Sequence, residues 1–246
     1  MKKVVCIVQA RTGSTRLPNK IFLKLGTKTV LDMVLERLGQ SKRINRIVVA
    51  SPASAENDVI EKYVTENYPA VNVSRGSEQD VLDRYYQAAT TNRADYVVRI
   101  TSDCPFIDPD VVDTVIGALV NSDADYAANV LGKRTYPRGL DVEAFTYEAL
   151  KRMWTETQDP EDREHVTQYL LKNPQVFKAI NVENSVDYSE YRLTLDEDAD
   201  YVLLTEICNR LSDIENFRLS DIVVILEEDP ELTKHNSHVQ QKYAQY

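Results

Sequence analysis

The first 130 residues alternate between two patterns of apolar residues. Short β-branched runs occupy five stretches, at residues 4–8, 47–50, 71–73, 96–100 and, less clearly, 125–130. Between them the apolar residues recur with the period of a helix, at residues 30–40, 57–68, 79–91 and 109–121. Strands that alternate with helices form βαβ units, because two parallel strands need a long crossover between them. The alternation predicts an α/β fold, a three-layer α/β/α sandwich around a mainly parallel, twisted sheet.

The regular alternation ends after residue 130. In chain order we expect a strand at residues 139–147, helices at 147–156 and 160–172, two strands within 176–195, and helices at 199–211 and 221–228. The polar tail from Pro230 carries two histidines and is expected to be loosely held. No repeat or linker divides the sequence, so we expect a single domain over residues 1–246, with an arm at residues 132–190.

Composition excludes several classes of protein. The net charge of −10 argues against nucleic-acid binding, which depends on a basic surface. No apolar run approaches the roughly 20 residues that span a bilayer. Three widely separated cysteines match neither a disulfide framework nor a zinc site. We therefore expect a cytoplasmic protein that binds neither nucleic acid nor a membrane.

The most informative segment follows the first expected strand and reads QARTGSTRLPNK, residues 9–20. In a parallel α/β sheet ligands bind beyond the carboxyl ends of the strands, so this loop lies at the expected binding edge. It offers a glycine turn at Gly13, two hydroxyl groups at Ser14 and Thr15, and three cations at Arg11, Arg16 and Lys20. Such groups suit phosphate oxygens. The loop matches neither GxxxxGK[ST] nor GxGxxG, and an ordinary charged surface loop is the alternative.

The loop resembles the signature loop of the cytidylyltransferases that make CMP-activated sugars, the acylneuraminate and 3-deoxy-manno-octulosonate enzymes. The sequence is most like their SpsF-type relatives in spore-coat polysaccharide biosynthesis. The resemblance continues through RGSEQDVLDRYYQAA (75–89), RITSDCPFIDP (99–109), GLDVEAF (139–145), REHVTQYL (163–170) and RLTLDEDADY (192–201). It implies the fold of nucleotide-diphospho-sugar transferases and a homodimer. It also implies Mg²⁺-dependent transfer of CMP from CTP to a sugar acid or sugar phosphate, in the biosynthesis of a surface polysaccharide.

The resemblance assigns the nucleotide site. The first loop would bind the triphosphate through Gln9, Ala10, Arg11, Gly13, Ser14, Thr15 and Lys20. Arg11, Arg16 and Lys20 would act in catalysis by holding the charge that develops as pyrophosphate leaves. Arg75 and Ser77 follow the third strand and would approach the base and ribose. Arg84 is one helical turn from Asp80 and either forms an ion pair with it or binds a ligand.

Two aspartates stand at expected strand ends and are candidate Mg²⁺ ligands. Asp103 follows the run at 96–100, and Asp196 follows Leu193 and Leu195. Carboxylates are the ligands that Mg²⁺ takes beside substrate phosphates, and the resemblance implies the same pair, with Asp103 beside the nucleotide. Asp103 could instead cap a turn. Asp198 and Asp200 have a simpler explanation as acids in the first turn of a helix.

The acceptor pocket is expected in the second half of the chain. The candidates are three residues of one expected strand and two of a nearby helix, namely Arg138, Asp141 and Glu143, and Arg163 and His165. His165 could equally be a structural hydrogen bonder. Arg99, a charge within an apolar strand, could orient Asp103 or a nearby acid rather than contact substrate.

Two other functions remain open at this point. A glycosyltransferase would use a DxD motif, and Asp123–Ala124–Asp125 has that spelling, although it lies before an expected strand rather than after one. A non-catalytic module that keeps only the nucleotide pocket is the second alternative.

Overall fold

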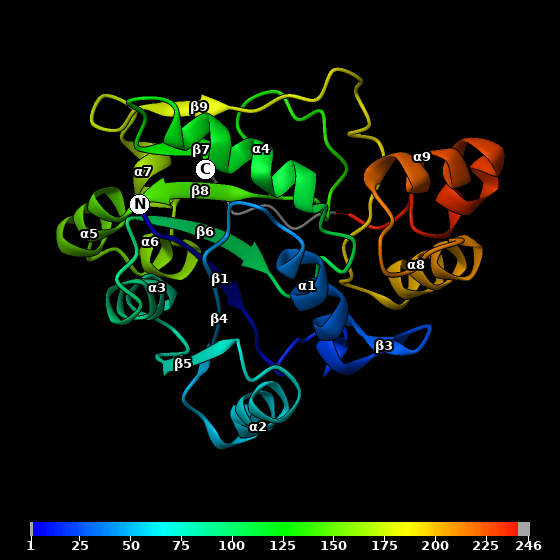
Figure 1. Cartoon of the computed structure of the whole chain (residues 1–246), viewed down its shortest axis with the longest axis horizontal. Coiled ribbons are helices and arrows are strands. Elements are labelled where there is room, and N and C mark those ends of the chain that lie inside the picture. Colours follow the sequence, from blue (N-terminus) through cyan, green and yellow to red (C-terminus); the bar gives the residue numbers. More distant parts are fainter. Residues whose placement is uncertain (1, 241–246) are drawn as a thin grey trace.

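The computed structural model describes residues 2–240, and within them a seven-stranded sheet has the order β5-β4-β1-β6-β8-β7-β9 (Figure 1). The strands are β1 Val4–Gln9, β4 Arg46–Pro52, β5 Asn72–Gly76, β6 Tyr96–Thr101, β7 Tyr126–Ala128, β8 Glu143–Thr146 and β9 Ala179–Asn181. Neighbouring strands pair in parallel except where β8 lies antiparallel to β6 and β7. The prediction of a mainly parallel sheet is confirmed.

Helices cover both faces of this sheet, as the alternation predicts. Side chains alternate between the faces along a strand, so Cys6 and Val8 of β1 pack into one core, and Val5 and Ile7 into the other. The first core holds helices α1 Val30–Gly39, α2 Asp58–Asn67 and α4 Pro109–Val120, and the second holds α3 Val81–Thr91 and α5 Tyr147–Glu156. These are the three layers of the expected sandwich.

Local sequence explains where the helices begin. Thr29 caps α1, because its hydroxyl accepts a hydrogen bond from the Asp32 amide. In return the Asp32 carboxylate accepts a hydrogen bond from the Thr29 amide. Asp108 caps α4 through the backbone amides of Asp110 and Val111, with Pro109 in the first turn. Each cap satisfies amides that the first helical turn leaves unpaired.

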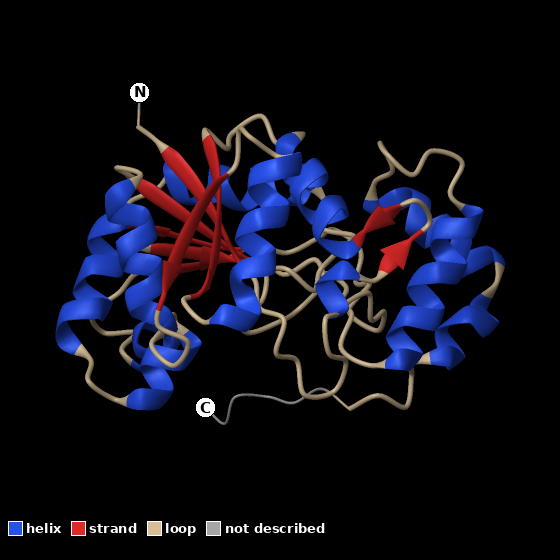
Figure 2. Cartoon of the chain, turned by 90° about the horizontal axis from the view of Figure 1, so that it is seen from below, coloured by secondary structure: helices blue, strands red, loops and turns tan. Residues whose placement is uncertain are grey.

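A small lobe packs at one end of the molecule. It consists of the hairpin β2 Lys24–Leu25 and β3 Lys28–Thr29, helices α8 Asp198–Arg210 and α9 Leu219–Glu228, and the 3₁₀ helix η3 Pro230–His235. Figures 1 and 2 both show α8 and α9 together, apart from the sheet. The hairpin joins α8 through the Tyr201 hydroxyl, which donates to the Lys24 carbonyl at 2.7 Å. Two segments that are joined by a bond between residues 177 positions apart therefore build one unit.

Three expectations about the second half need correction. Residues 132–190 do not form an arm, because β8 and β9 belong to the main sheet and α5 packs against it. The helix expected at 160–172 is divided into α6 Pro160–His165 and α7 Gln168–Lys172. Of the two strands expected at 176–195, β9 forms, and the other is reduced to a single bridge between Arg138 and Arg192.

The expectation of a loosely held tail is wrong for the part from Pro230 to Asn236. Leu232 is buried in the first core, and Asn236 is only 2% exposed. Residues 241–246 lie outside the described residues. Between residues 2 and 240, no helix combines the length and apolar character needed to cross a membrane.

Candidate active site

A cleft opens at the edge of the sheet where β1 and β6 end. These strands are parallel neighbours with Gln9 beside Thr101, so the loops after both emerge together. The cavity is about 350 Å³. Its walls come from the first loop, the segment after β6, the start of α3, the end of α6 and Asp196: Gln9, Ala10, Arg11, Ser14, Thr15, Arg16, Lys20, Glu78, Val81, Arg84, Arg99, Thr101, Ser102, Asp103, Glu164, His165 and Asp196.

The first loop owes its shape to a pair that sequence reasoning did not identify. The side chain of Asn57, fully buried in the 3₁₀ helix η2 Ala55–Asn57, accepts hydrogen bonds from the Thr12 amide at 2.9 Å and hydroxyl at 3.2 Å. The Thr12 carbonyl accepts from the amides of Ser14 and Asn19. Asn19 has φ 55°, and Gly13 does not adopt a positive φ, so the left-handed turn lies at Asn19 rather than at the glycine.

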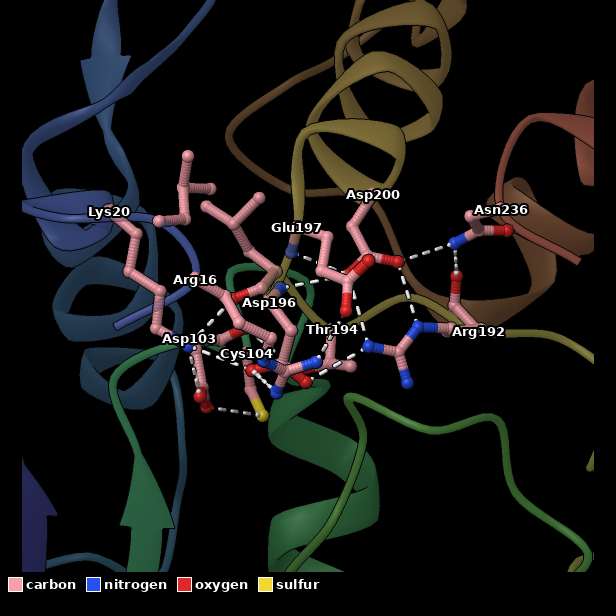
Figure 3. Close-up of polar contacts among 12 residues, drawn as sticks. Arg16, Lys20, Asp103, Cys104, Arg192, Thr194, Asp196, Glu197, Asp200 and Asn236 are labelled. Carbon is pink, nitrogen blue, oxygen red and sulfur yellow. Dashed lines mark hydrogen bonds and ion pairs between the residues drawn. The ribbon is translucent and has the colours of Figure 1, made fainter. Parts of the chain in front are cut away.

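Lys20 links the loop to the two candidate metal ligands. It begins the 3₁₀ helix η1 Lys20–Phe22. Its ammonium lies 2.7 Å from Asp103 Oδ2, 3.0 Å from Asp196 Oδ1 and 2.8 Å from the Leu195 carbonyl (Figure 3). Burial alone would lower the pKa of Lys20, but the two carboxylates outweigh burial and raise it. The same ammonium outweighs the effect of burial on Asp103, whose pKa is lowered.

The other two cations of the loop differ in what they contact. Arg16 lies 3.2 Å from Asp196 and 2.9 Å from Glu197. Arg11 is exposed on the cleft wall and forms no hydrogen bond or ion pair with another described residue. After burial and Tyr85, the charge of Arg11 is the next influence on Arg84, whose pKa is lowered. A cationic loop and two carboxylates thus face each other across the cleft.

Asp103 and Asp196 are brought together by the backbone. The Leu195 amide donates to the Asp103 carbonyl at 2.8 Å, and the Thr194 hydroxyl donates to the same oxygen at 3.2 Å. The segment before α8 is thus fixed against the loop after β6, and both carboxylates reach one ammonium. The two carboxylates are close together, as expected, but Asp196 follows no strand of the sheet and precedes α8 instead.

The donor set of this site fits Mg²⁺. Two carboxylates with room for phosphate oxygens is the arrangement in which proteins hold Mg²⁺ beside a nucleotide. Among residues 2–240 no group of three or more His, Cys, Asp or Glu side chains could hold a metal ion. An ion at Asp103 and Asp196 would therefore take its remaining ligands from water and phosphate.

For two arginines that line the cleft the structure narrows the alternatives that the sequence left open, and for Arg99 the pairing with a nearby acid is confirmed. Arg84 does not pair with Asp80, because the Asp80 carboxylate forms an ion pair with Arg163 at 2.7 Å. Arg84 is 4% exposed and donates to the Ser77 carbonyl at 2.5 Å, while its Nε is buried without a partner among the described residues. Arg99 pairs with Glu143 rather than Asp103, and its Nε is likewise unpartnered within residues 2–240. Both line the cleft, where they can receive an anion.

The residues expected at the base and ribose are engaged elsewhere. The guanidinium of Arg75 contacts Asp58 at 2.8 Å, Glu61 at 2.7 Å and the Pro52 carbonyl at 2.9 Å, so it points toward α2. Ser77 accepts a hydrogen bond from the Asp80 amide ahead of α3. Neither residue is among the described residues that line the cleft. The expectation for Arg75 is therefore corrected: it stabilises the packing of α2.

The five acceptor candidates do not come together. Of these described residues only His165 lines the cleft. The expected strand face of Arg138, Asp141 and Glu143 does not form, because β8 begins at Glu143. Arg138 lines a second cavity of about 360 Å³, and Asp141 pairs with Arg134.

Glu143 is a buried support rather than a ligand exposed to the cleft. It is 7% exposed and pairs with Arg99, while the hydroxyls of Tyr126 and Thr167 donate to it at 2.5 and 2.8 Å. Burial would raise the pKa of Glu143, but Arg99 and these hydroxyls lower it. Arg163 also has a structural role, since it joins α6 to the cap of α3.

A strained turn presents His165 to the cleft. Val166, a buried β-branched residue, has φ 62° and ψ −63°, and the Thr167 amide donates to the His165 carbonyl at 2.7 Å. This is a γ-turn of the rare, strained kind, and it ends α6 at His165. Thr167 then reaches Glu143, so the turn is anchored to the network beneath Arg99.

The DxD spelling has a structural explanation. Asp123 forms an ion pair with Lys178, and Asp125 accepts from the Lys178 amide at 2.9 Å, which joins the start of β7 to that of β9. Neither aspartate is among the described residues that line the cleft. The motif therefore does not support the glycosyltransferase alternative.

Comparisons with known proteins find similar sequences along nearly the whole chain. The family model described as Cytidylyltransferase matches residues 5–237. An uncharacterized protein of Methanocaldococcus jannaschii is 37% identical over 242 residues, covering 98% of this chain and 97% of the relative. The spore coat polysaccharide biosynthesis protein SpsF of Bacillus subtilis is 29% identical over 239 residues, covering 94% and 97% of the two chains.

Solved structures show the same fold. A cytidylyltransferase from Leptospira borgpetersenii serovar Hardjo-bovis superposes with a TM-score of 0.90 at 34% identity, covering 99% of this chain and 100% of its own. A CMP:2-keto-3-deoxy-manno-octonic acid synthetase, solved with CTP, has a TM-score of 0.65 at 18% identity and covers 85% of this chain and 99% of its own. At that identity the second likeness shows the fold alone.

Proposed function

This chain belongs to the cytidylyltransferase family, and from that premise we propose that it transfers CMP from CTP to a sugar acid or sugar phosphate and releases pyrophosphate. The observation that carries the proposal is the contact of Lys20 with both Asp103 and Asp196 in a cleft walled by the first loop. Cations that bind a triphosphate and carboxylates that bind Mg²⁺ are the two requirements of nucleotidyl transfer.

The triphosphate lies along the first loop in this proposal. Arg11 is free to bind it without breaking another contact within the described chain, whereas Arg16 and Lys20 exchange a carboxylate for a phosphate oxygen. Ser14 and Thr15 add hydroxyl donors on the same wall. Together these residues stabilise the charge of the departing pyrophosphate.

Asp103 and Asp196 would hold Mg²⁺, which would supply charge neutralisation beside the phosphates. The acceptor enters from the side of His165, where Arg84 and Arg99 can receive its carboxylate or phosphate. The hydroxyl of a sugar acid, or a phosphate oxygen of a sugar phosphate, attacks the α-phosphorus. The bond from the α-phosphorus to the bridging oxygen breaks, pyrophosphate leaves along the loop, and a hydroxyl nucleophile gives up its proton to water. We infer the preference for cytosine over other bases from membership of the cytidylyltransferase family.

Two measurements test this function. Thermal shifts with CTP, UTP, GTP and ATP, each with Mg²⁺, should show the largest stabilisation with CTP, because ligand binding to the folded state raises its stability. Pyrophosphate release should then require CTP, Mg²⁺ and one member of a panel of sugar acids and sugar phosphates. Tight CTP binding without pyrophosphate release across a broad panel would count against the enzymatic function and favour a binding module.

The remaining expectations from the resemblance are part of the same proposal. A homodimer is expected, and light scattering coupled to gel filtration measures it directly. A place in surface or spore-coat polysaccharide synthesis is expected from likeness to SpsF, and the cytoplasm is the expected location. The three cysteines are free and buried, in accord with a reducing compartment.

A further inference from the structure

Behind the cleft, Asp200 is a fully buried carboxylate with five hydrogen-bond donors. Arg192 donates to it at 2.8 and 3.0 Å, and the amides of Asp196 and Glu197 donate at 2.9 and 3.0 Å. The fifth donor is the Asn236 side chain, at 2.9 Å. A buried charge is tolerated when it is paired and its oxygens are satisfied, and this one meets both conditions.

This network determines how Asp196 is presented to the cleft. The Asp200 carboxylate accepts a hydrogen bond from the Asp196 backbone amide, and Arg192 donates to Oδ2 of the Asp196 side chain at 2.9 Å. With Oδ2 held from behind, Oδ1 points to Lys20 and Arg16 (Figure 3). Arg192 thus holds two carboxylates in one orientation, as a planar guanidinium can.

Asn236 brings the C-terminal lobe into this arrangement. It follows η3, is 2% exposed, and its amide nitrogen donates to the Arg192 carbonyl at 3.0 Å as well as to Asp200. One side chain therefore ties the end of the lobe to both residues that position Asp196.

We propose that Arg192, Asp200 and Asn236 are positioning residues that hold the Asp196 carboxylate toward the metal, so that the C-terminal lobe sets the metal affinity of the site. The inference rests on the proposed function, in which Asp196 binds the metal. Residues that orient a metal ligand typically change metal affinity by about 10- to 100-fold when they are replaced. Asn236 is about 40 positions from Asp196 in the sequence, and neither Arg192 nor Asp200, to which it donates, lines the cleft.

The test measures Mn²⁺ binding to the CTP complex by the loss of the free-ion signal in electron paramagnetic resonance. Asn236→Ala should weaken Mn²⁺ binding about tenfold, and Arg192→Lys should weaken it at least as much, because a lysine cannot bridge two carboxylates. CTP affinity without metal should change little in Asn236→Ala. All measurements are made where circular dichroism shows each variant fully folded.

The matched control is Asn216→Ala. Asn216 donates to Asp213 at 2.9 Å, an amide–carboxylate pair like that of Asn236, but in the exposed loop between α8 and α9. Its Mn²⁺ affinity should equal that of the wild type. A purely structural role for Asn236 would lower the melting temperature without changing Mn²⁺ affinity.

A third variant separates the inference from the proposed function. If Asp196→Asn abolishes Mn²⁺ binding while Asn236→Ala and Arg192→Lys leave it unchanged, the positioning role is wrong and the metal site stands. If Asp196→Asn also leaves Mn²⁺ binding unchanged, both the metal site and the positioning role are wrong.

Discussion

Lys20 donates a hydrogen bond to Asp103 across 2.7 Å, although 83 positions separate the two residues in the chain. The same ammonium reaches Asp196, so one cation of the first loop lies between both candidate metal ligands. In the proposed site a metal ion and this ammonium would compete for the same carboxylate oxygens. A bound triphosphate would relieve the competition by drawing Lys20 toward itself.

Replacement of Lys20 by glutamine should therefore have opposite effects on two ligands. CTP binding should weaken about 10- to 100-fold, because hydrogen bonds to a charged group contribute about 1.5–3 kcal/mol. Mn²⁺ binding without nucleotide should become tighter, because no ammonium occupies Asp103 and Asp196. Calorimetry measures the first effect and electron paramagnetic resonance the second.

Lys28→Gln is the control for that experiment, since Lys28 pairs with Glu36 and Glu215 outside the cleft. It should leave the affinities for both ligands unchanged. Unaltered Mn²⁺ affinity in nucleotide-free Lys20→Gln would show that the ammonium does not compete with the metal.

Gly139→Ala should destabilise the fold strongly. Gly139 has φ 97°, and an added Cβ would lie 2.4 Å from the Leu193 carbonyl carbon, in the segment that leads to Asp196. Strain and overlap together should cost at least about 2–4 kcal/mol in the free energy of unfolding. Urea unfolding measures it. Gly132→Ala is the control, because Gly132 has φ 52° with nothing within 4 Å, and it should cost about 1–2 kcal/mol. If both variants lost the same amount of unfolding free energy, the close approach of Gly139 to Leu193 would not be the cause of the loss.

Asp200 should make stability depend on pH. Burial would raise the pKa of Asp200, but Arg192, Asn236 and the Asp196 amide hold it below 3.8. A carboxyl with a lowered folded pKa stabilises the protein fully above its unfolded pKa, and this stabilisation is lost as pH falls through the folded pKa. Asp200→Asn should cost about 3–5 kcal/mol at pH 7, because it removes the buried carboxylate that pairs with the Arg192 guanidinium.

The difference in unfolding free energy between wild type and Asp200→Asn should narrow below about pH 4. Urea titrations from pH 7 to pH 3 follow it. Asp198→Asn, in the same helical turn but exposed, should cost much less at pH 7. A difference that stays constant to pH 3 would argue against an ionised Asp200 in the folded state.

Asn57→Ala should loosen the first loop. It removes the acceptor for the Thr12 amide and leaves a buried donor unsatisfied, which costs about 1–3 kcal/mol in unfolding free energy. CTP affinity should fall as well, since Thr12 fixes the backbone beside Ser14. Urea unfolding and calorimetry give the two numbers. The control Asn67→Ala removes an exposed bond to the Tyr63 carbonyl at the end of α2, and its CTP affinity should match that of the wild type.

The accuracy of the sequence predictions followed the range of the interactions involved. In the first 130 residues the strands of the main sheet and helices α1 to α4 were predicted within a few residues, because period and capping depend on neighbours in the chain. The short hairpin of β2 and β3 was not predicted. The helix at 160–172 was predicted whole because its break at Val166 has no local signal. A buried β-branched residue at positive φ is held there by Thr167 and the distant Glu143.

The candidate site divides in the same way. Asp103 and the first loop could be placed together, because β1 and β6 are parallel neighbours whose carboxyl ends share an edge. Asp196 follows no strand of the sheet, and its place depends on the bonds of Leu195 and Thr194 to the Asp103 carbonyl. Arg75 and Glu143 could not be assigned from position, because their partners come from other elements, Asp58 on α2 and Arg99 on β6. Asn57 and Asn236 carry no motif, and their importance appears only in what they contact.

The amino-acid sequence by itself determined the alternation of strands and helices, the cationic loop after the first strand and the family to which the chain belongs. Those properties depend on the period of the apolar residues and on short sequence motifs. Only the tertiary structure decided which charges neutralise one another: Lys20 with Asp103 and Asp196, Arg192 with Asp200, and Arg99 with Glu143. Pairing of buried charges depends on distance in space, and the fold sets that distance between residues that the sequence leaves far apart.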